Sequence, residues 1–275
     1  MIELVSSSPK YDVFDEGASC LKVPKTEAAV EDLARSVEWS NQIGAAISND
    51  SILLIPDAEL LGNGSARFEK VLGEELREDE VGAPLPLLVE VLAELRRIEV
   101  DWTGSAHEWV QDRVRSIGWP KELGNNSDNL VIPEIRQGVV HGDFAPKNMI
   151  ITKDGRLGLL DAEFGTYPTR PQYALPRMHD AAYFYHLLMC QYQDLSLASK
   201  FLQELERMTF LEDDIASKEF WVSVMERTLS MRRNFVLEPK EGFKVDVRRK
   251  DPEPYLKVLS RCVGVLWTPD VKTIV

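Results

Sequence analysis

The chain of 275 residues is 44% hydrophobic and 28% charged, which is typical of a globular protein and excludes an intrinsically disordered one. Its formal net charge of −13 argues against nucleic-acid binding, which needs a basic patch, and is compatible with a cationic substrate. The three cysteines are widely spaced and the first residues lack a signal-peptide pattern, so we expect a cytoplasmic protein that does not bind membranes. The sequence leaves the oligomeric state open.

The first sixty residues are predicted to form short strands around a single helix. A hairpin turn is predicted at residues 15–17, and Thr26 can cap a helix whose apolar residues recur at three- and four-residue spacing until Gly44. Pro56 ends the last strand. The predicted strands are residues 2–5, 11–14, 19–23 and 51–55.

Beyond an acidic segment of weak periodicity at residues 62–82, the pattern is mainly helical. One hairpin interrupts it, because two apolar runs at residues 149–151 and 157–160 flank a turn at residues 153–155. The predicted helices are residues 85–95, 105–114, 180–192, 196–208 and 218–234.

The order of these elements predicts an α+β fold, built as one domain with two lobes. A small β-rich lobe is expected at residues 1–60 and a larger, mainly helical lobe at residues 61–275, with a hinge near residues 56–64. Ligand sites favour clefts between such lobes. We therefore expect a ligand to bind near the hinge.

Three oxygen-bearing side chains stand at a spacing typical of phosphoryl transfer. Asp143 and Asn148 are five residues apart, and Asp161 follows the apolar run at residues 157–160. Phosphoryl transfer needs one carboxylate to orient and deprotonate a hydroxyl, and oxygen ligands to hold Mg²⁺ on the phosphates. The pattern therefore predicts a reaction type, and it leaves the substrate undefined.

The sequence His-Gly-Asp-x4-Asn at residues 141–148, with Leu-Leu-Asp-Ala-Glu at residues 159–163, resembles the aminoglycoside phosphotransferase and choline kinase-like family, which has the protein-kinase fold. The resemblance implies that Asp143 is the catalytic base and that Asn148 and Asp161 bind Mg²⁺. It also implies structural support from His141, which braces the loop, and from Asp180 at the start of the next helix.

The same resemblance assigns ATP-binding residues in the small lobe. Lys22 stands where the family has a lysine on the third strand, and Glu31 is its best partner, with Glu38 as the alternative. Ser7 and Ser8 occupy the turn that would cover the phosphates, in place of the glycines of a protein kinase.

Adenine recognition is expected at the hinge. Pro56 offers a backbone carbonyl and Ala58 a backbone N–H two residues later, which supplies one acceptor and one donor. The base that is bound is not encoded in side chains, so GTP stays an alternative to ATP.

The sequence therefore predicts an ATP-dependent kinase that phosphorylates a hydroxyl of a small molecule, such as an aminoglycoside, another amino alcohol or a sugar. Glu163 is the candidate substrate residue, because it lies two positions beyond Asp161. A protein kinase is an alternative, although no Ala-Pro-Glu element follows Asp161. A catalytically inactive, kinase-like binding or regulatory protein is another.

Overall fold

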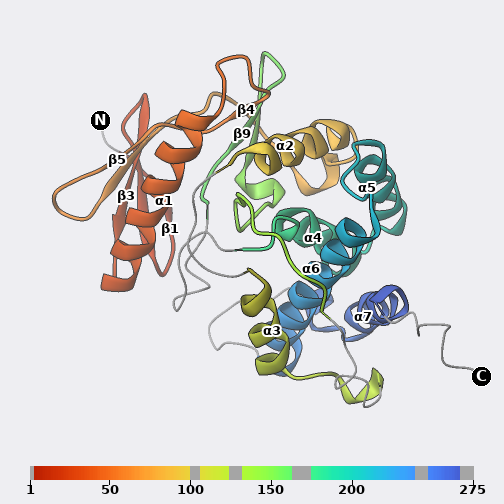
Figure 1. The fold of residues 1–275 in the computed structure, drawn as a ribbon. Helices are drawn as coiled ribbons and strands as arrows, with labels where there is room; N and C mark the ends of the chain where they lie inside the picture. Colours follow the sequence, from red (N-terminus) through yellow and green to blue (C-terminus); the bar gives the residue numbers. More distant parts are fainter. Residues whose placement is uncertain (1–2, 100–105, 124–131, 163–174, 239–246, 267–275) are drawn as a thin grey trace, which may run out of the picture. The chain divides into compact units, whose positions relative to one another are not determined.

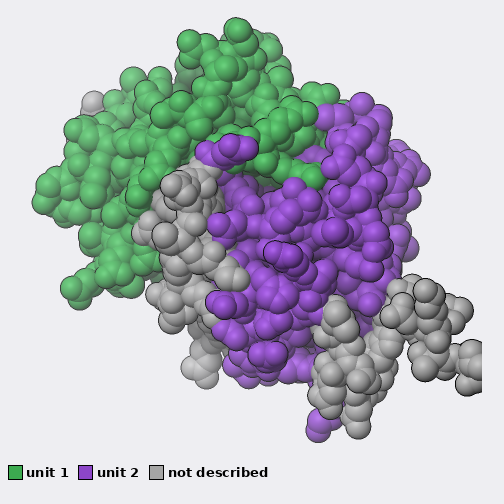
Figure 2. Space-filling model, viewed as in Figure 1, with its two compact units in different colours: residues 1–98, 141–172 green, residues 99–140, 173–275 purple. Residues whose placement is uncertain are grey.

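The computed structural model describes residues 3–99, 106–123, 132–162, 175–238 and 247–266. The chain divides into two compact units (Figure 2). Unit 1 contains residues 1–98 and 141–172, and unit 2 contains residues 99–140 and 173–275. The loop and hairpin that carry the predicted phosphotransfer residues thus belong to the same unit as the N-terminal strands.

Unit 1 holds an antiparallel five-stranded sheet in the order β1-β2-β3-β6-β5. Its turns follow local chemistry: Gly17 between the second and third strands has a φ of 89°, which glycine adopts without steric cost, and the Asp15 carboxylate accepts its N–H at 2.6 Å. The strands are β1 (Glu3–Ser7), β2 (Tyr11–Asp15), β3 (Ser19–Pro24), β5 (Ala58–Leu60) and β6 (Ala66–Glu69).

Helix α1 (Glu27–Ala46) packs against strands β3, β5 and β6 of this sheet (Figure 1). As predicted, Thr26 caps it, and its hydroxyl accepts the N–H of Ala29 at 3.2 Å. Leu33 and Val37 on the helix bury their side chains against two residues of β6, Ala66 and Phe68. These contacts form the apolar core between helix and sheet.

A second, four-stranded sheet completes unit 1, in the order β4-β9-β8-β7. Strands β8 and β9 form the predicted hairpin, and β4 lies parallel to β9 on its other side. Helix α2 (Leu85–Arg97) contacts β9. The strands are β4 (Leu53–Leu54), β7 (Gly73–Glu75), β8 (Met149–Thr152) and β9 (Leu157–Leu159).

The chain passes between the two sheets more than once, because β4 precedes β5 in the sequence but belongs to the other sheet. The five-stranded sheet continues to Glu69, so the expected boundary at residue 60 falls at the end of β5, inside the β5–β6 hairpin. One connection between the sheets is residues 55–57, between β4 and β5, and a later one is residues 70–72, between β6 and β7. Two glycines let the later connection lie close to the β8–β9 hairpin: a Cβ on Gly73 would overlap the carbonyl of Ile151, and one on Gly158 would lie 2.6 Å from Val71.

Unit 2 is built around α6, which is buried along nearly its whole length and contacts α3, α4 and α7 (Figure 1). Two helices continue into single π-helical turns, η5 (Leu187–Gln191) after α4 and η6 (Arg233–Leu237) after α6. The helices are α3 (Ala106–Ile117), α4 (His179–His186), α5 (Leu195–Arg207), α6 (Asp214–Arg232) and α7 (Glu253–Leu266). Short 3-10 turns occur at η1 (Glu78–Glu80), η2 (Lys121–Leu123), η4 (Pro146–Asn148) and η7 (Val247–Lys250).

None of the helices in the described part of the chain combines the length and the apolar run that crossing a bilayer requires. All three cysteines carry free thiols. Burial raises the pKa of the Cys190 and Cys262 thiols, so both stay protonated near neutral pH.

Candidate active site

The β8–β9 hairpin places Asn148 and Asp161 at the same end of one sheet. Met149 pairs with Leu159, and one position further the Leu160 N–H donates to the carbonyl of Asn148 at 2.9 Å. Asp161 therefore follows directly on the residue that is bonded to Asn148. Its φ of 57° lies in the left-handed region, which few residues other than glycine adopt.

Asn148 also holds Asp143. Its amide group donates to the Asp143 backbone carbonyl at 2.9 Å and to Oδ2 of the side chain at 3.0 Å. Both side chains are buried, with 6% of each residue exposed. Gly142, with a φ of 86°, supplies the left-handed step just before Asp143. Asn148 thus ties Asp143, within residues 141–148 (the Asp143 loop), to the start of the hairpin.

His141 connects the start of the Asp143 loop to the end of β9. Its Nε2 lies 2.8 Å from the carbonyl oxygen of Leu160, and because a carbonyl only accepts, this nitrogen carries the proton. The ring is fully buried and meets the edge of Trp39 on α1 at 5.6 Å between centroids. This geometry fits the bracing role expected for His141.

Lys147 is a residue that the sequence reasoning missed. Its Nζ lies 2.7 Å from Oδ2 of Asp143, the same oxygen that accepts from Asn148. The signal was available, because the two residues stand four apart, a spacing that brings side chains together in a helical turn. Lys147 is mostly exposed, so its positive charge lies beside Asp143 at the protein surface.

Lys22 and Asp161 meet within unit 1. The Lys22 ammonium forms an ion pair with Oδ1 of Asp161, and it also lies 5.1 Å from the centre of the Phe68 ring. The Lys22 side chain is nearly buried, whereas that of Asp161 is more than half exposed. The cation expected for phosphate and the carboxylate expected for Mg²⁺ are therefore side by side.

The expected partner of Lys22 is different in the structure. Glu31 forms an exposed pair with Arg35 one turn along α1, and Glu38 accepts from Gln42. Among the described residues, neither glutamate reaches Lys22. The cause is the direction in which each side chain leaves the helix. Leu33 faces the sheet, and Glu31, two positions away, points about 200° from it around the helix axis.

The hydroxyls of Ser7 and Ser8 form hydrogen bonds with neighbouring residues at the β1–β2 turn. Ser8 Oγ accepts the N–H of Tyr11 at 3.0 Å, and Ser7 donates to Asp12 at 2.7 Å. Lys25 adds a cation there, bonding Ser7 Oγ at 2.7 Å and the Ser8 carbonyl at 2.8 Å. The hydrogen bond from Lys25, with that from Ser7, holds the pKa of Asp12 below its usual value. Phosphate binding by Ser7 and Ser8 would have to replace these bonds.

Pro56, one of the two predicted hinge residues, lies in the connection between β4 and β5, where the chain passes from one sheet to the other. Ala58 is the first residue of β5, where it pairs with Phe68 and its N–H donates to Asn41 at 3.4 Å. Pro56 lines a cavity of about 360 Å³ together with residues 70–72, the connection between β6 and β7. The other residues lining this cavity are Leu54, Ile55, Glu69, Thr152, Lys153, Asp154 and Arg156.

Two predicted residues are not part of this cluster. Glu163 lies outside the described residues. Asp180 is buried in the first turn of α4, in unit 2. Its predicted bond to the Asp143 loop stays a prediction.

The oxygen atoms fit a Mg²⁺ ion bound together with phosphate. Since the amide nitrogen of Asn148 is committed to Asp143, its Oδ1 is the atom left to coordinate a cation. Asp161 adds a charged oxygen. In the described part of the chain no group of three or more His, Cys, Asp or Glu side chains could hold a metal by itself. Mg²⁺ suits such a site, because it takes few protein ligands and completes its shell with phosphate and water.

Comparison with known families gives one clear match. A sequence model described as the phosphotransferase enzyme family matches residues 6–170, which include the Lys22 strand, the Asp143 loop and Asp161. No individually curated protein matches the sequence.

Several solved structures share the fold. The ADP-bound aminoglycoside phosphotransferase APH(2'')-Ib is 18% identical, with a TM-score of 0.60 over 96% of this chain and 92% of that chain. The gentamicin complex of APH(2'')-IIa is 18% identical, with a TM-score of 0.58 over 96% and 91%. A choline/ethanolamine kinase family protein from Mesorhizobium loti is 15% identical, with a TM-score of 0.57 over 98% and 89%.

These structural matches confirm the predicted fold class. The chain has a kinase-like fold, with an N-terminal antiparallel sheet and a helical C-terminal region. Identities below one fifth carry the fold only.

Proposed function

Because the chain belongs to the phosphotransferase enzyme family, we propose that it transfers the γ-phosphate of ATP to a hydroxyl of a small molecule. The acceptor is an amino alcohol, a sugar or an aminoglycoside. The observation that carries the proposal is the position of Asn148, which bonds Asp143 through its side chain and the residue before Asp161 through its backbone. Asn148, itself one of the two proposed metal ligands, thereby couples the proposed base to the other ligand, Asp161.

The chemistry assigned to these residues is in-line phosphoryl transfer, which depends on positioning and charge neutralisation. Asp143 orients the acceptor hydroxyl and takes its proton. Lys22 binds the nucleotide phosphates. Lys147, bonded to Asp143 and mostly exposed, adds positive charge beside the proton acceptor.

Mg²⁺ would be held by Oδ1 of Asn148 and the Asp161 carboxylate. When bound, the ion neutralises the phosphate oxygens. Since Asn148 keeps its amide nitrogen on Asp143, binding the ion leaves the base in place.

The ligands of similar structures support a nucleotide and a small amine-bearing acceptor. One APH(2'')-IIa structure is a ternary complex with streptomycin and ATP, and an aminoglycoside 2'-phosphotransferase-IIIa structure contains GDP. A Plasmodium vivax ethanolamine kinase is also similar, at 11% identity and a TM-score of 0.56 over 95% of this chain and 81% of that chain. We propose ATP as the donor, with GTP as the alternative, and Glu163 as an acidic contact to the acceptor.

A second candidate is a kinase-like protein that binds its ligands without catalysis. Two observations favour it: the hydroxyls of Ser7 and Ser8 are engaged within their own turn, and Lys22 is bonded to Asp161 in place of a helical glutamate. The intact set of Asp143, Asn148 and Asp161 favours the enzyme. A protein kinase is disfavoured because no Ala-Pro-Glu sequence follows Asp161.

A thermal-shift titration separates these functions. ATP and GTP, each with and without Mg²⁺, are added to the full chain, and phosphate transfer is then screened over aminoglycosides, choline, ethanolamine, sugars and homoserine. We expect a Mg²⁺-dependent rise in Tm and transfer to at least one acceptor. No shift with either nucleotide would refute the proposal, and a shift without transfer to any acceptor would favour the non-catalytic candidate.

The role of Asp143 is tested with Asp143→Asn, which keeps the size of the side chain. Transfer should fall by about 100-fold or more, the contribution typical of a general base, while the nucleotide-induced Tm shift persists. Asp79→Asn is the matched control, because Asp79 is an exposed carboxylate that pairs with the nearby Arg77. Equal turnover in Asp143→Asn and the control would disprove the assignment.

A further inference from the structure

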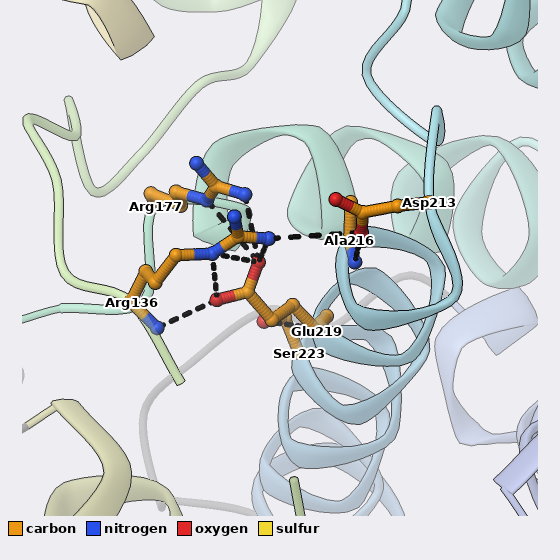
Figure 3. A network of polar contacts seen from close by, with 6 residues as sticks. All are labelled: Arg136, Arg177, Asp213, Ala216, Glu219 and Ser223. Atoms are coloured by element: carbon orange, nitrogen blue, oxygen red, sulfur yellow. Dashed lines mark hydrogen bonds and ion pairs between the residues drawn. The ribbon is translucent and has the colours of Figure 1, made fainter. Parts of the chain in front are cut away.

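Unit 2 contains a buried carboxylate bound by two arginines (Figure 3). Glu219 on α6 is fully buried. Arg136 donates to it from its backbone N–H at 2.6 Å, from Nε at 3.0 Å and from Nη2 at 2.6 Å. Arg177 donates from Nε at 3.1 Å and from Nη2 at 3.0 Å. Both carboxylate oxygens are therefore saturated with donors.

The two arginines belong to a short antiparallel ribbon. Arg177 N–H donates to the Arg136 carbonyl at 3.0 Å, and Gly138 N–H donates to the Leu175 carbonyl at 3.3 Å. Between these bonds Gln137 pairs with residue 176. Gly138 is required for this close approach, because a Cβ there would lie 2.6 Å from that of Arg177. We call residues 136–138 and 175–177 the arginine ribbon.

Glu219 ties the arginine ribbon to a fixed point of α6. The helix begins at its cap, Asp213, whose carboxylate accepts the N–H of Ala216 at 2.5 Å and lies 4.0 Å from Arg136. One turn after Glu219, the Ser223 hydroxyl donates to the Glu219 carbonyl at 2.8 Å. The ribbon is thus attached in the N-terminal half of α6, the helix that contacts α3, α4 and α7.

The arginine ribbon is joined to the Asp143 loop directly along the chain, with only two residues between them. Residue 138 is followed by two buried valines, Val139 and Val140, and then by His141. The other strand of the ribbon enters α4 at His179, one residue before Asp180. The segments before the proposed base and before the proposed supporting aspartate are therefore held by one carboxylate.

A buried carboxylate paired with arginines is seldom kept for stability alone. Desolvation of the charges offsets most of their attraction, and apolar side chains of similar volume often stabilise as well. What such a pair specifies is geometry, because five N–H groups donate to the carboxylate and fix two backbone segments on one helix.

We infer that Glu219 is a positioning residue for phosphoryl transfer. It acts through the arginine ribbon, which sets the backbone that enters the Asp143 loop. The inference rests on the proposed function of Asp143, and its test includes a measurement that requires no catalysis.

The same helix offers a matched control. Glu226 is a second buried glutamate of α6, paired with Arg113 on α3 at 3.2 Å and bonded to Ser230 at 3.1 Å. It binds one helix to another and touches no residue of the arginine ribbon in the described part of the chain. Glu226→Gln therefore removes a buried charge of the same type without releasing the ribbon.

The first measurement compares hydrogen–deuterium exchange in Glu219→Gln and Glu226→Gln. The new amide of Glu219→Gln presents a donor to two arginines that are themselves donors, so the ribbon should loosen. We expect exchange to rise by about 10-fold or more in peptides covering residues 136–148 of Glu219→Gln only, as expected when a local opening costs about 1.4 kcal/mol less. Equal protection of these peptides in both variants would overturn the inference.

The second measurement is turnover with the acceptor found in the screen. Glu219→Gln should lower kcat by about 10- to 100-fold, the effect of misplacing a base by about an ångström. The KM for nucleotide should change less than about 2-fold, because Lys22 and Asp161 lie outside the Asp143 loop that the ribbon holds. An equal loss of kcat in Glu226→Gln would reduce Glu219 to a structural residue and refute the inference.

Arg136→Gln keeps the test decisive if Glu219→Gln does not fold. Arg136 has 41% of its side chain exposed, and its loss leaves the Arg177–Glu219 pair in place. The same local exchange and the same split between kcat and KM are expected, with smaller size. Failure of the proposed function is distinguishable, because it would abolish nucleotide binding or the Asp143→Asn effect while the exchange result stands.

Discussion

The ammonium of Lys22 on β3 pairs with the carboxylate of Asp161, 139 positions further along the chain and just beyond β9. The pair joins the five-stranded sheet to the end of the hairpin. A Mg²⁺–nucleotide complex offers each group a new partner, phosphate for Lys22 and the metal for Asp161. We expect the complex to separate the pair.

This exchange of partners predicts different effects for the two side chains. Asp161→Asn should remove most of the Mg²⁺ dependence of the ATP-induced Tm shift, because an amide is a weaker Mg²⁺ ligand than a carboxylate. Lys22→Met should weaken ATP binding with and without Mg²⁺, by about 10-fold for the loss of one charge-assisted bond. Both are measured by thermal shift and calorimetric titration.

Glu31→Gln is the control for this pair. Its carboxylate is exposed and bonded to Arg35, so nucleotide affinity should stay within about 2-fold of the wild type, as expected for loss of a surface ion pair. If Glu31→Gln weakened ATP binding as much as Lys22→Met, the helical glutamate would be restored as the partner of Lys22.

Gly158→Ala should destabilise unit 1. The added Cβ would lie 2.6 Å from Cγ1 of Val71, in a buried strand that cannot yield easily. Overpacking of this kind costs about 1–3 kcal/mol of unfolding free energy, measured by urea denaturation. In the double variant with Val71→Ala most of this loss should be recovered, and purely additive effects would contradict the predicted contact.

Gly44→Ala is the matched control, and it should change the unfolding free energy in the opposite direction. Gly44 lies in α1, where a Cβ meets no atom within 4 Å. Gly44→Ala should therefore stabilise the protein by about 0.5–1 kcal/mol, the helix-propensity difference between the two residues.

The buried side chain of His186 should make the folded protein less stable in mild acid. Burial, with a smaller effect of the nearby Arg227 and Arg249, lowers the pKa of His186 from 6.5 to about 3. Below pH 6.5 the unfolded chain therefore binds a proton that the folded chain does not, so stability falls as pH falls from 6.5 toward 3. Between pH 7 and pH 5 this single group should remove ~2 kcal/mol of unfolding free energy.

Urea denaturation at pH 7, 6 and 5 checks this prediction in the variant His186→Gln. The variant should lose that part of the pH dependence, whatever its stability at pH 7. His107→Gln on α3 is the control and should keep it, because His186 is then intact. An unchanged pH dependence in His186→Gln would contradict the assignment.

The part of the site that could be predicted is local in sequence. Asn148 and Asp161 lie at the two ends of one hairpin, so apolar runs and turn residues were sufficient to bring them together. Lys22 was placed on its strand for the same reason. The fold class followed from the order of strands and helices, and the solved structures confirm it.

The parts that could not be predicted depend on which face of a helix meets the sheet or on which strands pair with each other. Glu31 was assigned by its distance from Lys22 in sequence, which does not say which side of α1 faces the sheet. Strand β6 was missed because it is only four residues long and follows a polar turn. A signal was present, since Ala66 and Phe68 alternate with the polar Arg67 and Glu69, and both are buried.

Asp161 holds a backbone conformation that glycine would adopt more easily, with a φ of 57°. A non-glycine residue in this region costs on the order of 1 kcal/mol. The folded protein would thus gain stability from a residue without a side chain at a position where the proposed chemistry requires a carboxylate. Stability and activity therefore favour different residues at position 161, and the aspartate found there is the one that favours activity.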